Sequence, residues 1–456
     1  MNVSRRRFLK HISAAAVGVG TVGFGLDSLR LDEGLLPEAR ATLAPDMEET
    51  NYIVYLSSGN VCARNGTTGN LDYSNAGDAT PVLQSVADAL TNGGTILVRA
   101  GTYSMSAAVL LSNPYTHIIL DSAATLTLSR AAPVQNSTPP YYPPYLLTLG
   151  ANNCTVQGGN MNGNNLVTVD DYLAAVGLVG AKSFLVNGVQ RSVVGARSCG
   201  IFRVSSMNID GFGAAFGANA GGLQVPTSDP TYTFAAPETY SYFEELTAVN
   251  PLTHGLNTSS PPPNGNTFPT TVCGMRFRHC MINCAGLNYQ QSTDKYVAAI
   301  GVGLDGDSQD IVVDDCAVYG NGNPPSTYQG KQTLGADGMN FEQYTSSDGI
   351  YAPKNCKFVR CFINGARISF AGSSSSGQSP LVANCEVLDC QVRFDVNTYD
   401  AAAILVENTV KCSIRGGWVV NAATGATYTI RTNEGTNASL VIDGVRGNLP
   451  PCDLSG

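Results

Sequence analysis

Two acidic residues in the second half of the chain have the type and spacing needed for acid/base chemistry. Asp305 and Glu342 each come three residues after an apolar residue, Val302 and Met339, at the same point of successive repeats. In stacked repeats their backbones lie about 4.8 Å apart. Two carboxyls this close share a proton or hold a cation, because ionising both is costly. Hydrolysis of a glycosidic bond requires such a protonated and ionised pair, and a spacing of about 5 Å favours retention.

Other polar residues nearby allow a different reaction. A Ca²⁺ ion held by Asp305, Asp307 and Glu342 would suit elimination, in which the metal acidifies a uronate before a base removes its α-proton. Arg367, one repeat further, is then a candidate base or carboxylate clamp, and Asn340 is a candidate substrate-binding residue. The competing interpretation is a set of solvated charges paired with Arg367. A register slip of one residue would turn these side chains inward.

Aromatic residues in the loops supply candidate sugar-stacking platforms. Tyr141 and Tyr142 lie in the Pro-rich segment 131–145, and Tyr289 lies in the segment 285–297. In a solenoid, insertions of this kind emerge on one side and often form the binding surface. The alternative is that long loops are simply tolerated, because closing a longer loop costs little.

The elements that must position these residues are short strands in a repeat. In each of five superposable segments, apolar and β-branched residues alternate with other residues, and a polar pair interrupts this alternation before it continues. The segments are 275–282, 311–318, 356–363, 385–392 and 412–419. Alternation of period two on both sides of a break predicts two strands joined at a corner. Recurrence of the unit predicts a β-solenoid. Four of the segments carry a Cys at the same place, and we expect Cys280, Cys316, Cys361 and Cys390 to stack, mostly as reduced thiols.

One amphipathic helix precedes the repeats. The pattern predicts a helix over 79–92 that begins after Asp78 as N-cap and ends at Gly93. A solenoid needs a cover over its first open core layer, and this helix is placed to provide it. The expected organisation is an export signal over 1–41, an irregular segment over 42–75 and a solenoid domain over 76–456.

A family resemblance follows from these features. The run GGTILVRAGTY at 93–103, after a helix and before repeats that contain Asn-Cys, resembles the pectate-lyase superfamily. The resemblance implies an all-β, single-stranded right-handed parallel β-helix with an N-terminal capping helix. It also implies a substrate groove on one sheet. The superfamily contains lyases, hydrolases, epimerases, phage depolymerases and non-enzymatic surface proteins.

A second resemblance concerns Asp337. The segment 336–339, Ala-Asp-Gly-Met, is similar to the Asn-Thr-Asp-Gly segment of polygalacturonases, in which the Asp is catalytic. The resemblance makes Asp337 a candidate catalytic acid. The later Asp-Asp pair of that family is replaced here by Ala366-Arg367, and its Gly-His-Gly motif is absent. Polygalacturonase activity itself is therefore not expected.

The N-terminus and the composition restrict location and partners. Residues 4–10, Ser-Arg-Arg-Arg-Phe-Leu-Lys, resemble a twin-arginine export signal, so we expect an exported protein that does not span a membrane after signal removal. A net charge of −9 argues against nucleic-acid partners. Cys273, His279, Cys280 and Cys284 fit no standard zinc spacing.

These observations favour an exported protein that binds a polysaccharide along its side. Glycoside hydrolysis is the leading chemistry, with Asp305, Asp337 and Glu342 as catalytic candidates and no cofactor required. The first alternative is a Ca²⁺-dependent polysaccharide lyase. The second is a non-enzymatic surface protein that uses the solenoid as a rigid rod, since fold alone does not fix function. The sequence leaves the sugar and the oligomeric state open.

Overall fold

The computed structural model describes the chain from residue 50 onward, with gaps. The chain divides into two units, Met1–Pro45 and Asp46–Gly456, and every described residue lies in the second. The described residues are 50–131, 145–151, 153–171, 173–179, 182–186, 189–193, 203–210, 212, 214–219, 241–259, 272–306, 308–322, 324–346, 349–371, 381–394, 402–422, 428–432 and 439–450.

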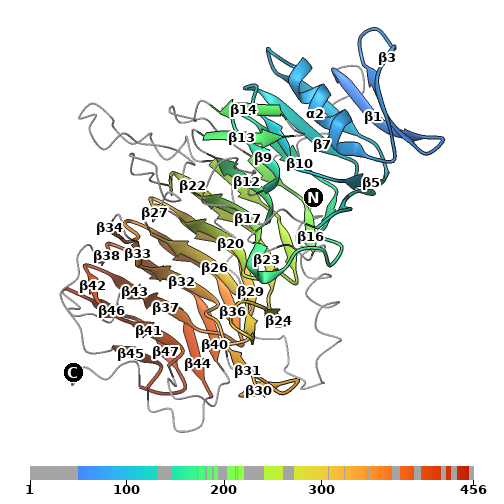
Figure 1. Cartoon of the computed structure of the whole chain (residues 1–456). Coiled ribbons are helices and arrows are strands. Elements are labelled where there is room, and N and C mark those ends of the chain that lie inside the picture. Colours follow the sequence, from blue (N-terminus) through green and yellow to red (C-terminus); the bar gives the residue numbers. More distant parts are fainter. Residues whose placement is uncertain are drawn as a thin grey trace, which may run out of the picture. The chain divides into compact units, whose positions relative to one another are not determined.

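Three long sheets hold most strands of the described residues (Figure 1). Sheet A runs, in spatial order, through β3 (Leu71–Ala76), β2 (Asn60–Asn65), β1 (Tyr52–Ser57), β4 (Gly94–Val98), β7 (Thr116–Leu120), β10 (Thr155–Gln157), β15 (Arg203–Ser205), β18 (Ser241–Glu244), β22 (Met275–Arg278), β28 (Val312–Asp314), β35 (Lys357–Val359), β39 (Glu386–Leu388), β43 (Ser413–Arg415) and β46 (Val441–Asp443).

Sheets B and C follow the same spatial progression. Sheet B contains β5 (Gly101–Met105), β8 (Ala124–Leu128), β11 (Asn160–Asn162), β16 (Asn208–Asp210), β19 (Thr247–Val249), β23 (Met281–Asn283), β29 (Ala317–Tyr319), β36 (Phe362–Asn364), β40 (Gln391–Phe394), β44 (Trp418–Asn421) and β47 (Arg446–Gly447). Sheet C contains β6 (Val109–Leu111), β9 (Tyr145–Leu149), β12 (Ala174–Val179), β17 (Ala214–Asn219), β20 (His254–Ser259), β26 (Ile300–Asp305), β32 (Met339–Glu342), β37 (Ile368–Ala371), β41 (Ile404–Val406) and β45 (Ile430–Thr432).

Each turn of the coil visits sheets A, B and C in order. Strands β22, β23 and β26 make one turn, and β28, β29 and β32 make the next, with parallel pairing in all three sheets. Connections between parallel strands are right-handed in nearly all proteins. The chain is therefore a right-handed parallel β-helix, and the predicted fold class is confirmed.

The predicted strand–corner–strand repeat is the passage from sheet A to sheet B. At its corner His279, Asp315, Arg360 and Asp389 adopt φ values of 51°, 50°, 50° and 51°. This left-handed conformation reverses the direction of the chain within one residue and is tolerated best by glycine and by short polar side chains. The polar pair that interrupts the alternation in the sequence is thus the corner itself.

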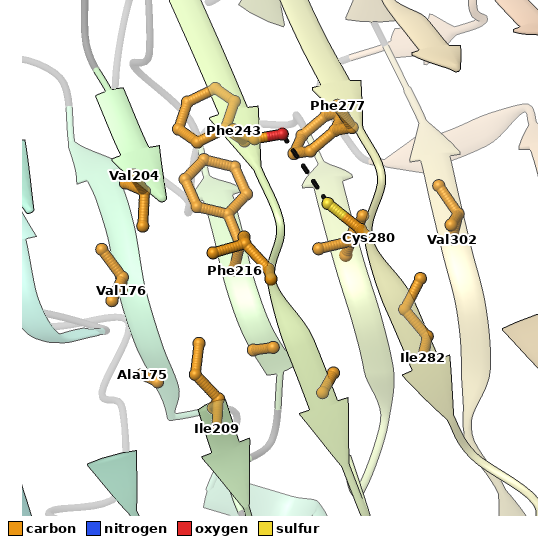
Figure 2. Close-up of a cluster of buried hydrophobic side chains, with 14 of the residues drawn as sticks. Ala175, Val176, Val204, Ile209, Phe216, Phe243, Phe277, Cys280, Ile282 and Val302 are labelled. Carbon is orange, nitrogen blue, oxygen red and sulfur yellow. Dashed lines mark hydrogen bonds between the residues drawn. The ribbon is translucent and has the colours of Figure 1, made fainter. Parts of the chain in front are cut away.

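The core consists of side chains stacked turn upon turn. Phe243 and Phe277 stack with ring centroids 5.0 Å apart, and Phe216 lies 4.2 Å from Phe243 (Figure 2). Cys280 lies beside them, and its thiol donates to the carbonyl oxygen of Phe243 at 3.7 Å (Figure 2). Stacking buries apolar area on every turn, which supplies most of the favourable free energy of folding.

The predicted cysteine column is confirmed. Backbone hydrogen bonds follow it from turn to turn, since Ala317 donates to Cys280, Phe362 to Cys316 and Gln391 to Cys361. The ten cysteines whose side chains the structure describes are all free and buried. A second column consists of Cys356, Cys385 and Cys412.

The capping helix is α2 (Ala79–Ala89), and it begins at the predicted residue. The Asp78 carboxylate accepts the backbone N–H of Thr80 at 3.0 Å, so Asp78 is the N-cap. The helix ends three residues before the predicted 92, with Leu90 as C-cap. It contacts β2, β3, β5 and β6 and buries Val82, Leu83 and Val86. No helix in the described part of the chain is long and apolar enough to cross a membrane.

The prediction that 42–75 is irregular is wrong for most of its described residues. Strands β1, β2 and β3 occupy much of this stretch and form an antiparallel meander. β1 also pairs in parallel with β4 and so joins sheet A. Tyr52, Ile53 and Val54 are consecutive buried residues, and such a run gives no alternating signal in the sequence.

Small sheets and a 3₁₀ helix lie between the main strands. They are β13 (Lys182–Val186) with β14 (Val189–Val193), β21 (Val272–Cys273) with β27 (Ser308–Gln309), β24 (Leu287–Gln290) with β25 (Lys295–Ala298), β31 (Lys331–Leu334) and β30 (Thr327–Tyr328), β33 (Tyr344–Ser346) with β34 (Gly349–Tyr351), β38 (Val382–Ala383) with β42 (Thr409–Val410), and the 3₁₀ helix η3 (Val169–Asp171).

Candidate functional site

Sheet C brings the two acidic residues into register. Val302 pairs with Met339 and Asp305 pairs with Glu342, as the spacing predicts. Leu304 and Phe341 are fully buried in the core, so the residues after them, Asp305 and Glu342, point away from it. The carboxyls therefore leave adjacent strands on the outer face of the sheet, with backbones about 4.8 Å apart.

One expectation about this face is wrong. Strand alternation alone predicts that Gly255, Gly301 and Gly338 form an outward column immediately before the inward residues Leu256, Val302 and Met339. A Cβ at these positions would instead meet the side chains of Ile282, Val318 and Ile363, which belong to the sheet B core. The three glycines line the corner between sheets B and C, where the strands approach too closely for a side chain.

Asp305 is a largely buried carboxyl beside a neutral histidine. Its side chain is only 14 % exposed, and Oδ2 lies 3.8 Å from Nε2 of His254. Desolvation, followed by the charge of Glu342, raises the pKa of Asp305 well above its ordinary value. Burial lowers the pKa of His254 to about 4, so the ring is neutral near pH 7 and supplies no positive charge to Asp305.

Glu342 has a different environment on the next strand. Asn340 donates an Nδ2 hydrogen bond to Glu342 Oε2 at 2.8 Å. Desolvation and then the charge of Asp337 raise the pKa of Glu342, while the amide hydrogen bond lowers it. A hydrogen bond to the ionised form favours ionisation. Asp305 receives no such bond among the described residues.

Asp337 and Arg367 form an ion pair at the edge of the site. Arg367 Nε donates to Asp337 Oδ1 at 2.6 Å, and the Ser369 hydroxyl donates to Asp337 Oδ2. The competing interpretation, in which Arg367 pairs with Asp305 and Glu342, is wrong for Arg367, since its partner is Asp337. All three carboxyls lie on or beside β26 and β32, as predicted.

Three buried acceptor oxygens at this site have no hydrogen-bond partner among the described residues. They are Oδ1 of Asn257, of Asp305 and of Asn340. Asn340 is only 1 % exposed, and the three residues come from the neighbouring strands β20, β26 and β32. Buried acceptors are normally satisfied, so such a group calls for a donor from outside the chain.

The remaining predicted site residues are only partly located. Asp307, Tyr141 and Tyr142 lie outside the described residues. Within the described part, no group of three or more His, Cys, Asp or Glu side chains is arranged to hold a metal ion.

Tyr289 belongs to an exposed aromatic cluster on the small sheet of β24, β25, β30 and β31. It is 40 % exposed, and its ring centroid lies 5.4 Å from that of Tyr296, which is 4.9 Å from Tyr328. The Tyr289 hydroxyl donates to Asp294 at 2.6 Å, and the Lys331 ammonium lies 4.9 Å from the ring centroid. Rings held in this way can stack on a sugar without further ordering.

Two site residues were missed by sequence reasoning. Neither His254 nor Asn257 is among the residues that the sequence predicts for the site. The usable signal was register, because His254 and Asn257 lie on either side of Leu256, which pairs with Val302. Asp314, although it precedes the corner residue Asp315, is not solvated. It is 1 % exposed and bonded to Arg276 at 2.7 Å.

Comparison with known proteins gives likenesses at the level of fold. The mannuronan C-5 epimerase A-module of Azotobacter vinelandii has 14% identity and a TM-score of 0.49, covering 83% of this chain and 94% of its own. A surface adhesin of Streptococcus pneumoniae has 11% identity and a TM-score of 0.48, covering 82% and 95%. The endo-xylogalacturonan hydrolase of Aspergillus tubingensis has 11% identity and a TM-score of 0.41, covering 82% and 91%. No family model and no curated protein matches the chain. Likenesses at this level do not decide between epimerisation, adhesion and hydrolysis.

Proposed function

We propose that this protein hydrolyses a polysaccharide bound along the outer face of sheet C. The observation that carries the proposal is the pair Asp305–Glu342, two largely buried carboxyls in register with no Lys or Arg beside them among the described residues. Burial without a cation costs stability. Perturbed pKa values of this kind cluster at functional sites.

The two carboxyls have environments suited to different roles. Asp305 is desolvated and lies next to a neutral ring, so it is the protonated general acid. Glu342 accepts the Asn340 amide hydrogen bond, which favours its ionised form as the nucleophile. Environments that separate the pKa values of two neighbouring groups are the usual basis of acid/base assignment.

The reaction proceeds by two displacements. Asp305 transfers its proton to the glycosidic oxygen as the bond from that oxygen to the anomeric carbon breaks. A Glu342 oxygen forms a bond to the anomeric carbon at the same time. Ionised Asp305 then removes a proton from water, whose oxygen displaces Glu342, so the water is divided between the two new chain ends and both carboxyls return to their starting states.

The neighbouring residues position this pair. Asn340 orients Glu342, and His254 limits the solvent around Asp305. Asp337, held by Arg367 and Ser369, contributes the negative charge that raises the pKa of Glu342. Asp337 thus acts through Glu342 as a positioning residue in this assignment.

The proposal is tested with Asp305→Asn and Glu342→Gln on a panel of polysaccharides, with new reducing ends as the readout. Each variant is expected to lose about 10²–10⁴-fold in kcat. Glu386→Gln, which removes a carboxylate paired with Lys357 on sheet A, is the matched control and is expected to keep its activity. Unchanged turnover in both site variants would remove the pair from the mechanism.

The same assay distinguishes the rival functions. A Ca²⁺-dependent lyase is a specific rival because buried amide and carboxylate oxygens without partners are suitable calcium ligands. Elimination leaves a double bond that absorbs in the near ultraviolet, and its rate would fall with a chelator. Absence of turnover on every glycan would instead favour a rod-like surface protein.

We further propose that the protein is exported by the twin-arginine route. The support is the sequence of residues 4–10, which lie outside the described part of the chain. Replacing Arg5 and Arg6 by Lys is expected to retain the precursor in the cytoplasm, as seen by fractionation. Unaltered export of this variant would contradict the proposal.

A further inference from the structure

We propose that the sugar bound at Asp305 and Glu342 carries no carboxylate, so that the substrate is a neutral or amino-sugar glycan rather than a uronan. This inference rests on the proposed function, because it specifies the substrate of the same groove. It is carried by three observations: the charges on the outer face of sheet C, the engagement of Arg367, and the unpartnered acceptors.

Strands β20, β26, β32 and β37 of sheet C contain no Lys or Arg, and His254 on β20 is neutral near pH 7. Its outward positions carry Asn257 on β20, Gly303 and Asp305 on β26, Asn340 and Glu342 on β32, and Ser369 and Ala371 on β37. A substrate carboxylate would therefore meet the ionised Glu342 with no Lys or Arg on these strands to offset the repulsion, which disfavours binding.

Arg367, the cation at the edge of the site, is already engaged. Arg367 donates to Asp337 at 2.6 Å, and the two side chains are 24 % and 17 % exposed. If Arg367 turned to a substrate carboxylate, Asp337 would lose its cation while remaining close enough to Glu342 to raise its pKa. Removing one partner of a largely buried ion pair is costly. Arg367 is therefore a poor clamp for an acidic sugar.

The hydrogen-bonding groups of the site also favour an uncharged sugar. Oδ1 of Asn257 and of Asn340 are acceptors that need donors. Hydroxyl and amino groups donate, whereas an ionised carboxylate only accepts. A neutral or amino sugar can thus satisfy these oxygens, and a uronate places a further acceptor among them.

Matched polymers that differ only in the carboxylate test the inference. Galacturonan, mannuronan and glucuronan are each compared with their carboxyl-reduced forms, which keep the same linkages. Binding to Asp305→Asn and turnover by the unmodified protein are measured, each with and without a chelator. The reduced form of at least one pair is expected to be preferred about tenfold or more, and this preference should shrink as salt screens the repulsion.

A charge variant sharpens the test. Ala371 pairs with Glu342 on the outer face, so Ala371→Lys places a cation beside the site, and Ala371→Met is the neutral control of similar length. The Lys variant is expected to reduce the discrimination against the uronan, and the Met variant is not. Equal discrimination in both variants would overturn the electrostatic argument.

The outcomes separate the two proposals. Preference for a uronan over its reduced form, with turnover that still depends on Asp305, overturns the present inference and leaves the hydrolase proposal intact. Turnover of a uronan only when Ca²⁺ is present overturns it as well. Failure to bind or turn over either form of these polymers, and every member of the wider polysaccharide panel including amino-sugar glycans, contradicts the proposed function itself.

Discussion

Two aspartates on neighbouring strands of the coil, Asp305 and Asp314, are both largely buried, but their side chains have different partners. Asp314, at the end of β28, is bonded to Arg276 at 2.7 Å and to Arg360, with Arg278 at 3.8 Å. Asp305, at the end of β26, has neutral His254 and the carboxyl of Glu342 beside it, and its Oδ1 has no hydrogen-bond partner among the described residues. One carboxyl is neutralised by its surroundings, and the other is left unsatisfied.

The difference shows how to separate structural from functional acids in a solenoid. A buried carboxylate with cations contributes to the cohesion of adjacent turns, and removing it leaves charged partners without compensation. A buried carboxyl without cations lowers stability in the resting protein, so a benefit elsewhere must explain its presence. The assignment of Asp314 as structural and Asp305 as functional leads to predictions that experiments can contradict.

The largest expected effect concerns catalysis. Asp305→Asn should lower kcat by about 10²–10⁴-fold, because it removes the proton that leaves with the glycosidic oxygen. Asp314→Asn, on another sheet, should leave kcat unchanged in the protein that remains folded. Steady-state kinetics on one substrate compares the two directly. Equal losses in both variants would mean that the contrast does not concern function.

The next effect concerns stability, and here the larger loss is expected for the Asp314 variant. Asp314→Asn should lower the free energy of unfolding by about 3 kcal/mol, because Arg276, Arg278 and Arg360 lose their common partner. Asp305→Asn should leave stability unchanged or raise it, since it removes a desolvated carboxyl. Chemical denaturation of both variants measures this. A more severe loss in Asp305→Asn would contradict the assignment.

A third prediction concerns pH and His254. Its pKa in the fold is about 4, below the ordinary 6.5, so folding favours the neutral ring. The resulting stability is complete above pH 6.5 and is lost as the pH falls through 4, with a span of about 3 kcal/mol.

Comparison with His254→Asn isolates this contribution, because Asp305 and Glu342 act in the opposite direction. Their pKa values are raised, so their ionisation destabilises the fold as the pH rises. The unmodified protein should lose more stability than the variant between pH 6.5 and 4. Parallel stability curves would show that the ring is not buried in solution.

The smallest effect concerns Tyr289. Replacing this exposed ring by Ala should raise KM about fivefold with little change in kcat, the loss of one stacking contact of about 1 kcal/mol. Tyr289→Phe retains the ring and should behave like the unmodified protein. A fall in kcat at constant KM would assign the ring to the chemical step instead.

The register of the candidate site was predictable because one face of each strand is buried. Once Val302 and Met339 are recognised as inward residues, the positions of Asp305 and Glu342 follow. The glycines before Val302 and Met339 could not be assigned to a face in the same way. A residue without a side chain gives no hydrophobic or polar pattern that would indicate the core or the outer face. Their position depends on the approach of Val318 and its counterparts from another sheet.

The roles of individual charges were less predictable. Sequence alone placed Asp314 in solvent because corner residues are usually exposed. Its burial depends on arginines contributed by other turns, 36 to 46 residues away for Arg278 and Arg360. His254 was missed for the same reason, since its neighbour Asp305 is 51 residues later. Contacts between residues so far apart in the sequence leave no local sequence pattern from which they could be predicted.

The corner glycines have a practical consequence for anyone who wishes to retarget the groove. Gly255, Gly301 and Gly338 leave no room for a larger residue, because an added Cβ would meet the core side chains of sheet B, and the spacing of the reactive pair is fixed by the pairing of β26 with β32. The loops that leave the other ends of the same sheet C strands are separate from this corner between sheets B and C. Specificity can therefore be redesigned by loop exchange while the reactive geometry is inherited unchanged.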